Sequence, residues 1–175
     1  MSLTPLHFAE LTTAEEIPAK TIIVNEGDIC NKILFIKKGC IRAYYNTDGK
    51  EVTLQFFFEG DSVTSLESFL NNVPSLITLE TLETCQVSLI DNVAFLNLIE
   101  RDNSVKDWFY KTAIEKLFIH TNRLCSLLNI KPFERYQLLL NEKPELFQRI
   151  PQHYIASYLG ITAVSLSRIR NRYIS

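Results

Sequence analysis

Hydrophobic and polar positions alternate in short runs through the first part of the chain. Between residues 20 and 61 the runs TIIV, KILFI, CIRAYY and VTLQFFF are separated by the polar segments NEGD, KKGC, NTDGKE and FEGD. Short β-rich runs with Gly and Asn-Asp turns predict an antiparallel sandwich or barrel, in which YYNTDGKEVTLQF forms one hairpin. Asp61 and Ser62 offer an N-cap for a short helix reaching about Leu70, after which LITLETLETCQVSLID returns to strand patterning. The pattern therefore predicts a small β-barrel with one inserted helix.

The segment from residue 104 to residue 128 has helical spacing and contains no Gly or Pro. One apolar stripe, with members four or seven residues apart, consists of Phe109, Ala113, Leu117, Leu124 and Leu128. A second apolar surface consists of Val105, Trp108, Ile114, Phe118 and Ile119. A helix with two apolar faces needs two partners, either the β-domain and the same helix of a second copy, or two parts of one chain. We expect the first arrangement, which is a homodimer.

The C-terminal segment has the spacing of two short helices joined by a tight turn. A preceding helix is predicted from Pro132 to the segment NEKP, and QHYIASYLGITAVSLSRI follows after a brief turn. Ala156 is small where two helices would cross, and Gly160 permits the positive φ of a tight turn. Thr162 is placed to cap the second helix. This is the pattern of a helix-turn-helix, whose second helix enters the major groove of DNA.

The charge distribution separates this helical pattern from an ordinary packed hairpin. Residues 149 to 175 contain four arginines and no Asp or Glu. The formal net charge of the whole chain is −2, so residues 1 to 148 have a net charge of −6. A surface that approaches phosphates must avoid carboxylates, so DNA binding is expected. Arg168 is predicted to contact guanine, and Arg170 and Arg172 to contact phosphates. The full set of candidate DNA-binding residues is Thr162, Ala163, Val164, Ser165, Ser167, Arg168, Arg170 and Arg172.

Composition narrows the class of protein further. The chain is 46% hydrophobic and 22% charged, and it has no run of the roughly 18 apolar residues that a membrane helix needs. The N-terminus lacks the basic start and apolar stretch of a signal peptide, so a cytoplasmic protein without a membrane partner is expected. The four cysteines form no C-x-x-C pair and are interpreted as reduced, mostly buried thiols. We therefore predict neither a metal nor a cofactor.

Three segments, IASYLGITAVSLSRIR, PFERY and FFFEGDSVTSLESFLNNVPS, resemble the Bacteroidetes branch of the Crp/Fnr superfamily of transcription regulators. The resemblance extends over nearly the whole chain and implies an α+β protein in three parts. These are a cyclic-nucleotide-binding-like sensor β-barrel of the double-stranded β-helix or jelly-roll type at 1–100, a dimerisation helix at 101–129 and a helix-turn-helix domain at 130–175. It also implies a homodimer that binds a palindromic operator in double-stranded DNA, with RNA polymerase as a further candidate partner.

Two departures from the family pattern limit what the resemblance implies. Members that bind cyclic AMP carry an Arg-Ser pair for the phosphate, but Ser75 and Leu76 occupy these positions, so cyclic AMP is not the expected effector. Ala163 and Val164 occupy the positions at which family members contact bases with an Arg-Glu pair. The operator sequence is therefore expected to differ from the one that those members recognise. An effector of unknown identity would meet residues of the inserted helix, the next strand and the dimerisation helix: Thr64, Ser65, Glu67, Ser75, Thr78, His120 and Thr121. The preferred interpretation is that these hydroxyls cap a helix and a turn without any ligand.

Two other functions are alternatives to a transcription regulator. A ligand-sensing protein whose degenerate DNA-binding end has become a protein-interaction module would account for Ala163 and Val164. An enzyme of the cupin kind would need histidines on neighbouring strands, but His7, His120 and His153 are far apart in the sequence. No nucleophile elbow or phosphate-binding loop is present either, so we do not expect an enzyme.

Overall fold

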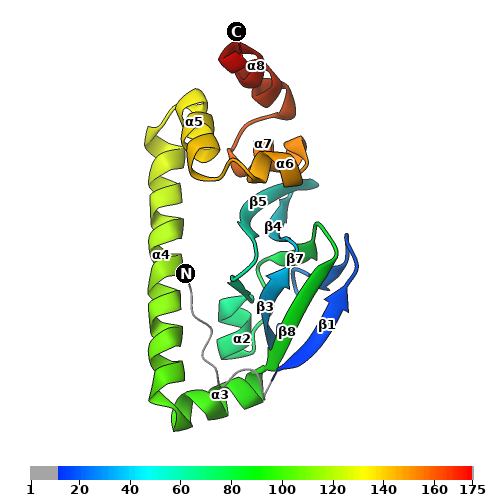
Figure 1. Ribbon diagram of the computed structural model, residues 1–175, viewed down its shortest axis with the longest axis vertical. Helices are drawn as coiled ribbons and strands as arrows, with labels where there is room; N and C mark the ends of the chain where they lie inside the picture. Colours follow the sequence, from blue (N-terminus) through cyan, green and yellow to red (C-terminus); the bar gives the residue numbers. More distant parts are fainter. Residues whose placement is uncertain (1–11, 175) are drawn as a thin grey trace. The chain divides into compact units, whose positions relative to one another are not determined.

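The computed structural model describes residues 12–174 and divides into two compact units (Figure 1). The first unit contains residues up to Asn46 and Leu54–Ile114, and the second contains Thr47–Thr53 and the chain from Glu115 onward. The tip of one hairpin therefore belongs to the second unit. No helix within the described range has the length and apolarity needed to cross a membrane.

The first unit is built on two antiparallel sheets, each with four strands. Their orders are β1-β8-β3-β6 and β2-β7-β4-β5. The strands are β1 (Thr13–Ile17), β2 (Ile22–Val24), β3 (Lys32–Lys38), β4 (Ile41–Thr47), β5 (Lys50–Phe57), β6 (Ser62–Val63), β7 (Thr78–Thr81) and β8 (Cys85–Asp91). This confirms the α+β class and the antiparallel sheets. The described strands pair into two separate sheets, and no pairing that would close one barrel is present among them.

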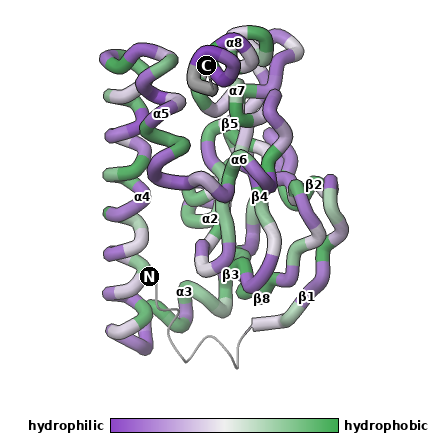
Figure 2. Tube along the Cα trace, turned by 45° about the horizontal axis from the view of Figure 1, so that its top comes forward, coloured by the Kyte–Doolittle hydropathy of each residue, from purple (hydrophilic) through white to green (hydrophobic). Residues whose placement is uncertain are grey.

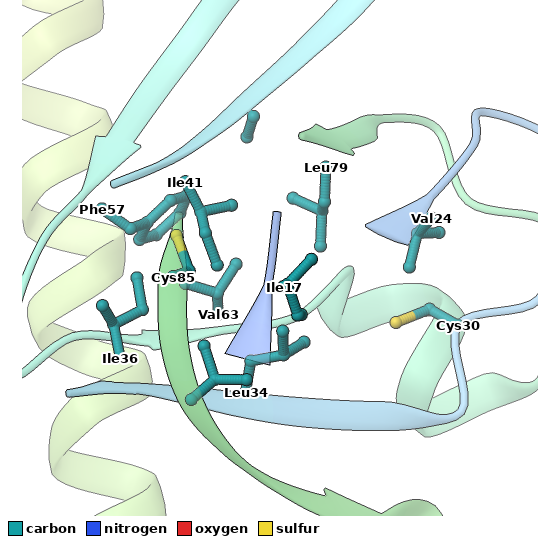
Figure 3. Close-up of a cluster of buried hydrophobic side chains, with 12 residues drawn as sticks. Ile17, Val24, Cys30, Leu34, Ile36, Ile41, Phe57, Val63, Leu79 and Cys85 are labelled. Atoms are coloured by element: carbon teal, nitrogen blue, oxygen red, sulfur yellow. The ribbon is translucent and has the colours of Figure 1, made fainter. Parts of the chain in front are cut away.

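Strand β3 shows why the apolar run KILFI is buried on both sides. Leu34 and Ile36 belong to the core between the sheets, together with residues such as Ile41 and Leu79 (Figure 3). The alternate residues Ile33 and Phe35 belong to a second core that involves the helices. Successive strand residues point to opposite faces, so a strand buried on both faces is apolar throughout.

The second core joins the inserted helix to the two helices that follow the sheets. These helices are α2 (Leu66–Asn71), α3 (Asn92–Arg101) and α4 (Asn103–Asn129). The ring of Phe95 lies edge-on to Phe69 and Phe109, at centroid distances of 5.6 and 5.4 Å. Asp91 caps α3 by accepting a hydrogen bond of 2.9 Å from the Ala94 amide. Aromatic packing therefore fixes the start of α4 against the sheet domain.

The second unit consists of the rest of α4, the hairpin tip and four short helices. These are α5 (Pro132–Glu142), α6 (Leu146–Arg149), α7 (Gln152–Tyr158) and α8 (Ala163–Ile174). Tyr136 and Phe147 pack edge-to-face at 5.3 Å between centroids. The other buried apolar side chains of this core are Leu139, Leu146, Ile150, Ile155, Ala156, Leu159 and Leu166.

Most of the predicted elements are confirmed, and one boundary is wrong. The hairpin of β4 and β5 and the helices from Pro132 and over 104–128 all form as expected. Helix α2 does not start after Asp61, because residues Ser62–Val63 pair with β3 as strand β6. Asp61 instead accepts a hydrogen bond from the Phe58 amide at 2.9 Å, and Ser65 takes the N-cap position of α2.

All four cysteines have free thiols, and three of them are buried: Cys30, Cys40 and Cys85. This confirms the expectation of mostly buried thiols; Cys125, on α4, is exposed. His7 lies outside the described residues, so its predicted separation from the other histidines is untested.

Candidate nucleic-acid interface

Helices α7 and α8 are joined by a tight turn centred on Gly160. The φ of Gly160 is +67°, in the left-handed region that favours glycine. The amide of Gly160 donates to the Ser157 carbonyl and that of Ile161 to the Ala156 carbonyl, both at 3.0 Å. A Cβ at Gly160 would lie 3.1 Å from Leu127 Cδ2, so the turn is also packed closely against α4. The roles predicted for Ala156 and Gly160 fit this geometry.

The first turn of α8 is held by two side chains that the sequence suggested as DNA contacts. Thr162 Oγ1 accepts a hydrogen bond from the Ser165 amide at 3.1 Å, as expected of an N-cap. The same oxygen lies 2.9 Å from Ser165 Oγ. Both hydroxyls therefore contribute to the start of the helix.

The remaining candidates on α8 differ in how far they are exposed. Leu166 is buried at 1% exposure, whereas Val164 is 62% exposed. Ala163, Ser167 and Arg168 are also exposed, and Arg170 is half-buried. The guanidinium of Arg172, also exposed, lies 5.9 Å from the centre of the Phe133 ring on α5. Arg168 is therefore the arginine on the side of α8 away from its packed face, and Arg172 reaches toward α5.

The base of this two-helix arrangement is organised by Arg135, the arginine of PFERY. Its side chain is buried at 9% exposure. Nη2 donates to the Leu159 carbonyl at 2.9 Å, and Nε donates to the same oxygen at 3.2 Å. Nη1 donates to the carbonyls of Ile130 at 2.5 Å and Leu127 at 3.4 Å. One guanidinium thus supplies donors to the C-terminal ends of both α4 and α7, whose last carbonyls have no partner within their helices.

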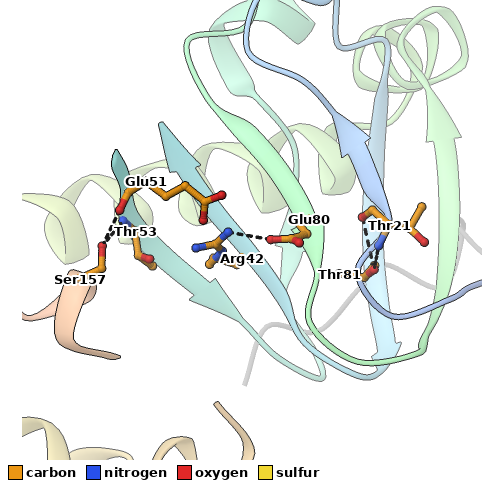
Figure 4. A network of polar contacts seen from close by, with 7 residues as sticks. All are labelled: Thr21, Arg42, Glu51, Thr53, Glu80, Thr81 and Ser157. Carbon is orange, nitrogen blue, oxygen red and sulfur yellow. Dashed lines mark hydrogen bonds and ion pairs between the residues drawn. The ribbon is translucent and has the colours of Figure 1, made fainter. Parts of the chain in front are cut away.

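Helix α7 is also bonded to the tip of the β4–β5 hairpin within the second unit. Ser157 Oγ accepts from the Thr53 amide at 2.9 Å and donates to the Glu51 carbonyl at 3.0 Å (Figure 4). Arg123 of α4 donates to the carbonyls of Thr53 and Tyr158, each at 2.9 Å. Its guanidinium also lies 4.1 Å from the centre of the Tyr158 ring. Nothing in the sequence pattern pointed to these contacts.

The environment of Tyr158 shows that this junction is largely shielded from water. Burial raises the pKa of Tyr158 above its ordinary value; the charge of Arg123 lowers it, and that of Glu142 raises it. The raised pKa keeps the phenol neutral under ordinary conditions.

The expected effector residues of the first unit are mostly engaged with one another or with the backbone. Ser75 Oγ donates to Ser65 Oγ at 2.8 Å and also lies 2.6 Å from the Ile77 carbonyl. Thr64 Oγ1 donates to the Lys32 carbonyl at 2.9 Å. Thr78 Oγ1 accepts from the Glu26 amide at 3.0 Å. The structure therefore brings Ser65 and Ser75 together and gives Thr64 and Thr78 partners elsewhere in the first unit.

Glu67 differs from these hydroxyls because it is exposed, in the first turn of α2. Sequence reasoning missed Ser68, whose buried Oγ accepts from the Cys30 amide at 2.8 Å. The two candidates on α4, His120 and Thr121, are exposed residues of the second unit. Partial burial lowers the pKa of His120 below its ordinary value, and the charges of Arg123 and Lys116 lower it further.

The half of α4 that belongs to the second unit carries an uncovered apolar stripe. Leu117, Leu124 and Leu128 are 61%, 58% and 74% exposed, and Phe118 beside them is 61% exposed. Hydrophobic and hydrophilic residues alternate along this helix (Figure 2). These four side chains are therefore not buried by the described residues of the second unit.

The described residues form two antiparallel sheets with an inserted helix, followed by a long helix and a pair of short helices around a tight turn. The model of the cyclic nucleotide-binding domain matches residues 14–102, slightly more than half of the chain. The chain belongs to this domain family. A comparison with curated proteins found no match.

Solved structures of regulators show the same fold over nearly the whole chain. The c-di-GMP-responsive global regulator CLP of Xanthomonas campestris has a TM-score of 0.76 at 18% identity, covering 95% of this chain and 88% of that chain. FixK2 from Bradyrhizobium japonicum has a TM-score of 0.78 at 17% identity, covering 92% and 83%. The catabolite activator protein of Thermus thermophilus has a TM-score of 0.61 at 18% identity, covering 97% and 83%. At these identities the similarity shows the fold alone.

Proposed function

We propose that the protein is a dimeric transcription regulator of the Crp/Fnr type, not an enzyme, and that α7 and α8 form its DNA-binding helix-turn-helix. The observation that carries the proposal is the outward side of α8. Opposite the buried Leu166, this side presents the exposed Arg168 and Val164 in a segment without any Asp or Glu. A helix with this surface fits the major groove, where arginine makes paired hydrogen bonds to guanine.

Phosphate contacts are assigned to the arginines around this surface. Arg170 is half-buried at the edge of α8, and Arg172 reaches toward α5, so both are suited to the DNA backbone on either side of the groove. Thr162, Ala163, Ser165 and Ser167 surround the first turns of the helix and complete the proposed interface. Charge-based contacts of this kind weaken as the salt concentration rises.

A homodimer is proposed because of the exposed stripe on α4. Leu117, Thr121, Leu124 and Leu128 recur at alternating spacings of four and three residues, as in the seam of a two-helix coiled coil. Pairing of two such stripes would remove three exposed leucines per chain from water. A two-fold symmetric dimer presents two copies of α8, so its operator in double-stranded DNA would be palindromic. RNA polymerase is the further partner that this role implies.

The functional division proposed along the chain is a sensor at 1–100, a dimerisation helix at 101–129 and a DNA-binding domain at 130–175. For the sensor, we propose that the effector is not cyclic AMP, despite the family to which the domain belongs. Glu67 is the one charged residue between Thr64 and Thr78, and its charge is negative. An anionic phosphate placed against this segment would have no cation there to offset its loss of water.

Binding to DNA from the parent genome tests the proposal. Fluorescence anisotropy with labelled upstream fragments should show binding that falls steeply between low and moderate salt. Arg168→Ala should reduce affinity for the preferred fragments by about tenfold or more. Lys143→Ala, which removes an exposed cation just after α5, serves as the matched control and should bind nearly as the wild type does. An intact dimer that binds no fragment at low salt would refute the proposal.

Val164 supports one alternative, in which α8 has become a protein-interaction surface. An apolar residue that is 62% exposed at the centre of the outward face suits a protein partner as well as a thymine methyl group. In that case Arg168→Ala would leave DNA affinity unchanged. A sequence-dependent loss on the same substitution would dismiss this alternative.

A further inference from the structure

We infer that the tip of the β4–β5 hairpin positions the helix-turn-helix for DNA binding, and that Ser157 is the positioning residue that joins the two. The tip consists of Thr47–Thr53, which belong to the second unit, whereas the remaining residues of β4 and β5 belong to the first unit. The inference rests on the proposed function, because it assigns a role in DNA binding to the contacts that hold α7. It adds a route by which the strands of the proposed sensor reach the DNA-binding helices.

The first argument is the way in which the Ser157 hydroxyl bonds the tip. Strand β5 stands at the end of its sheet, and the backbone groups on the outer edge of such a strand have no neighbouring strand to bond. Ser157 Oγ accepts from the Thr53 amide at 2.9 Å and donates to the Glu51 carbonyl at 3.0 Å (Figure 4). One hydroxyl of α7 therefore takes the place of a neighbouring strand at two backbone groups of the tip.

The second argument is that Thr53 is held from two helices at once. Its amide is bonded by Ser157 of α7, and its carbonyl accepts from Arg123 of α4 at 2.9 Å. The same nitrogen of Arg123 donates to the carbonyl of Tyr158, the next residue of α7, also at 2.9 Å. Helix α7 cannot shift relative to the tip without breaking these hydrogen bonds. The tip therefore fixes α7 against α4, the helix proposed for dimerisation.

The third argument is that a buried polar group opposes this docking. The side chain of Thr53 is 0% exposed, yet its Oγ1 has no hydrogen-bond partner among the described residues. A buried hydroxyl without a partner is destabilising, because it has lost its hydrogen bonds to water. Docking of the tip is therefore a balance between the stabilising bonds of Ser157 and the destabilising hydroxyl of Thr53. Single substitutions can shift such a balance in either direction.

The position of α7 matters for DNA binding because α7 determines where α8 lies. The two helices are joined by the tight turn at Gly160, whose amide is bonded to the Ser157 carbonyl at 3.0 Å. Docking of the tip therefore holds the proposed reading helix in one orientation before DNA arrives. A binding surface held in advance loses less freedom on binding, so its apparent affinity is higher. Displacement of the tip through β4 and β5 would lower the affinity for DNA.

Hydrogen exchange of the full-length protein, measured on peptides by mass spectrometry, tests the docking itself. Ser157→Ala removes two hydrogen bonds, so exchange over the tip should be faster by about fivefold or more. Thr53→Val removes the hydroxyl without a partner and should slow this exchange. Thr47→Val makes the same change at an exposed residue of the tip and should leave the exchange as in the wild type. Unchanged exchange over α5 shows that each variant is folded.

DNA binding then tests the positioning role. Anisotropy with the fragment that the wild type binds most tightly should show weaker binding by Ser157→Ala, by about fivefold or more. Adding Thr53→Val to Ser157→Ala should recover about twofold or more of the lost affinity, because it favours the docked tip. Adding Thr47→Val to Ser157→Ala should recover none of it.

Three results would overturn the inference and leave the proposed function intact. The first is wild-type DNA affinity in Ser157→Ala although the tip exchanges faster. The second is a loss of affinity that Thr53→Val does not recover, because such a loss marks a defect within α7 alone. The third is unchanged exchange over the tip in Ser157→Ala. If the wild type binds no fragment at low salt, the proposed function fails, and the positioning role fails with it whatever the exchange of the tip.

Discussion

Replacing Arg135 by methionine tests how the second unit is held together. Methionine keeps much of the buried aliphatic volume but removes every donor to the Leu159, Ile130 and Leu127 carbonyls. Leu159 is 3% exposed, so water cannot easily replace the donors at its carbonyl. A hydrogen bond to a charged group contributes about 1.5–3 kcal/mol, and the bonds at the more exposed end of α4 are partly replaced by water. We expect the free energy of unfolding to fall by about 3 kcal/mol.

Equilibrium unfolding in urea, followed by far-UV circular dichroism, measures this change through the helices of the second unit. Lys131→Met is the matched control, because Lys131 is an exposed cation of the same segment and its loss should change stability by about 0.5 kcal/mol or less. Arg135→Lys should recover little of the loss, because one ammonium cannot reach carbonyls on two helix ends as the planar guanidinium does. If Arg135→Met unfolds at the same urea concentration as Lys131→Met, the role assigned to Arg135 is wrong.

Three further predictions follow from other parts of the second unit. Gly160→Ala should lower the free energy of unfolding by about 1–2 kcal/mol from its positive φ alone. The loss of stability should be larger than that caused by Gly49→Ala, because Gly49 has a φ of +76° but open space around it. Thermal unfolding compares the two variants. Equal losses of stability would show that the contact with Leu127 is unimportant. The lowered pKa of His120 means that the unfolded chain takes up a proton more readily than the folded one, so stability should fall as pH drops through the window below about 6.5. Unfolding of His120→Gln across that window should show a weaker dependence on pH, and an unchanged slope would contradict the assignment. Leu124→Lys should convert the proposed dimer to a monomer in sedimentation velocity, because the substitution places a charge in the apolar stripe of α4; a variant that stays dimeric would place the interface elsewhere.

The regular elements could be predicted because each depends on short-range spacing. The β4–β5 hairpin follows from its Asp48-Gly49 turn, and α4 follows from a long helical pattern without Gly or Pro. The tight turn at Gly160 and the cap at Thr162 also follow from residues within a few positions of each other. The predicted start of α2 was wrong because the two-residue strand β6 pairs with β3, which is distant in the sequence. No pattern among the residues near β6 predicts this pairing.

The contacts that organise the candidate site were beyond sequence reasoning for a related reason. Ser157 is bonded to Thr53, a residue 104 positions away, through a backbone amide that carries no signature in the sequence. In the sequence, Arg135 cannot be distinguished from an arginine on the surface of a helix. Only the fold shows that the C-terminal ends of α4 and α7 lie around its side chain.

Recognition of a specific DNA sequence through α8 is proposed here, and it can be tested on the whole genome. Affinity capture of sheared genomic DNA by the purified full-length protein, followed by sequencing, tests it most directly. The captured fragments should share an inverted repeat with half-sites about one helical turn apart, and Arg168→Ala should not enrich this repeat. Recovery of the same fragments by the wild type and Arg168→Ala, without any shared repeat, would contradict the claim.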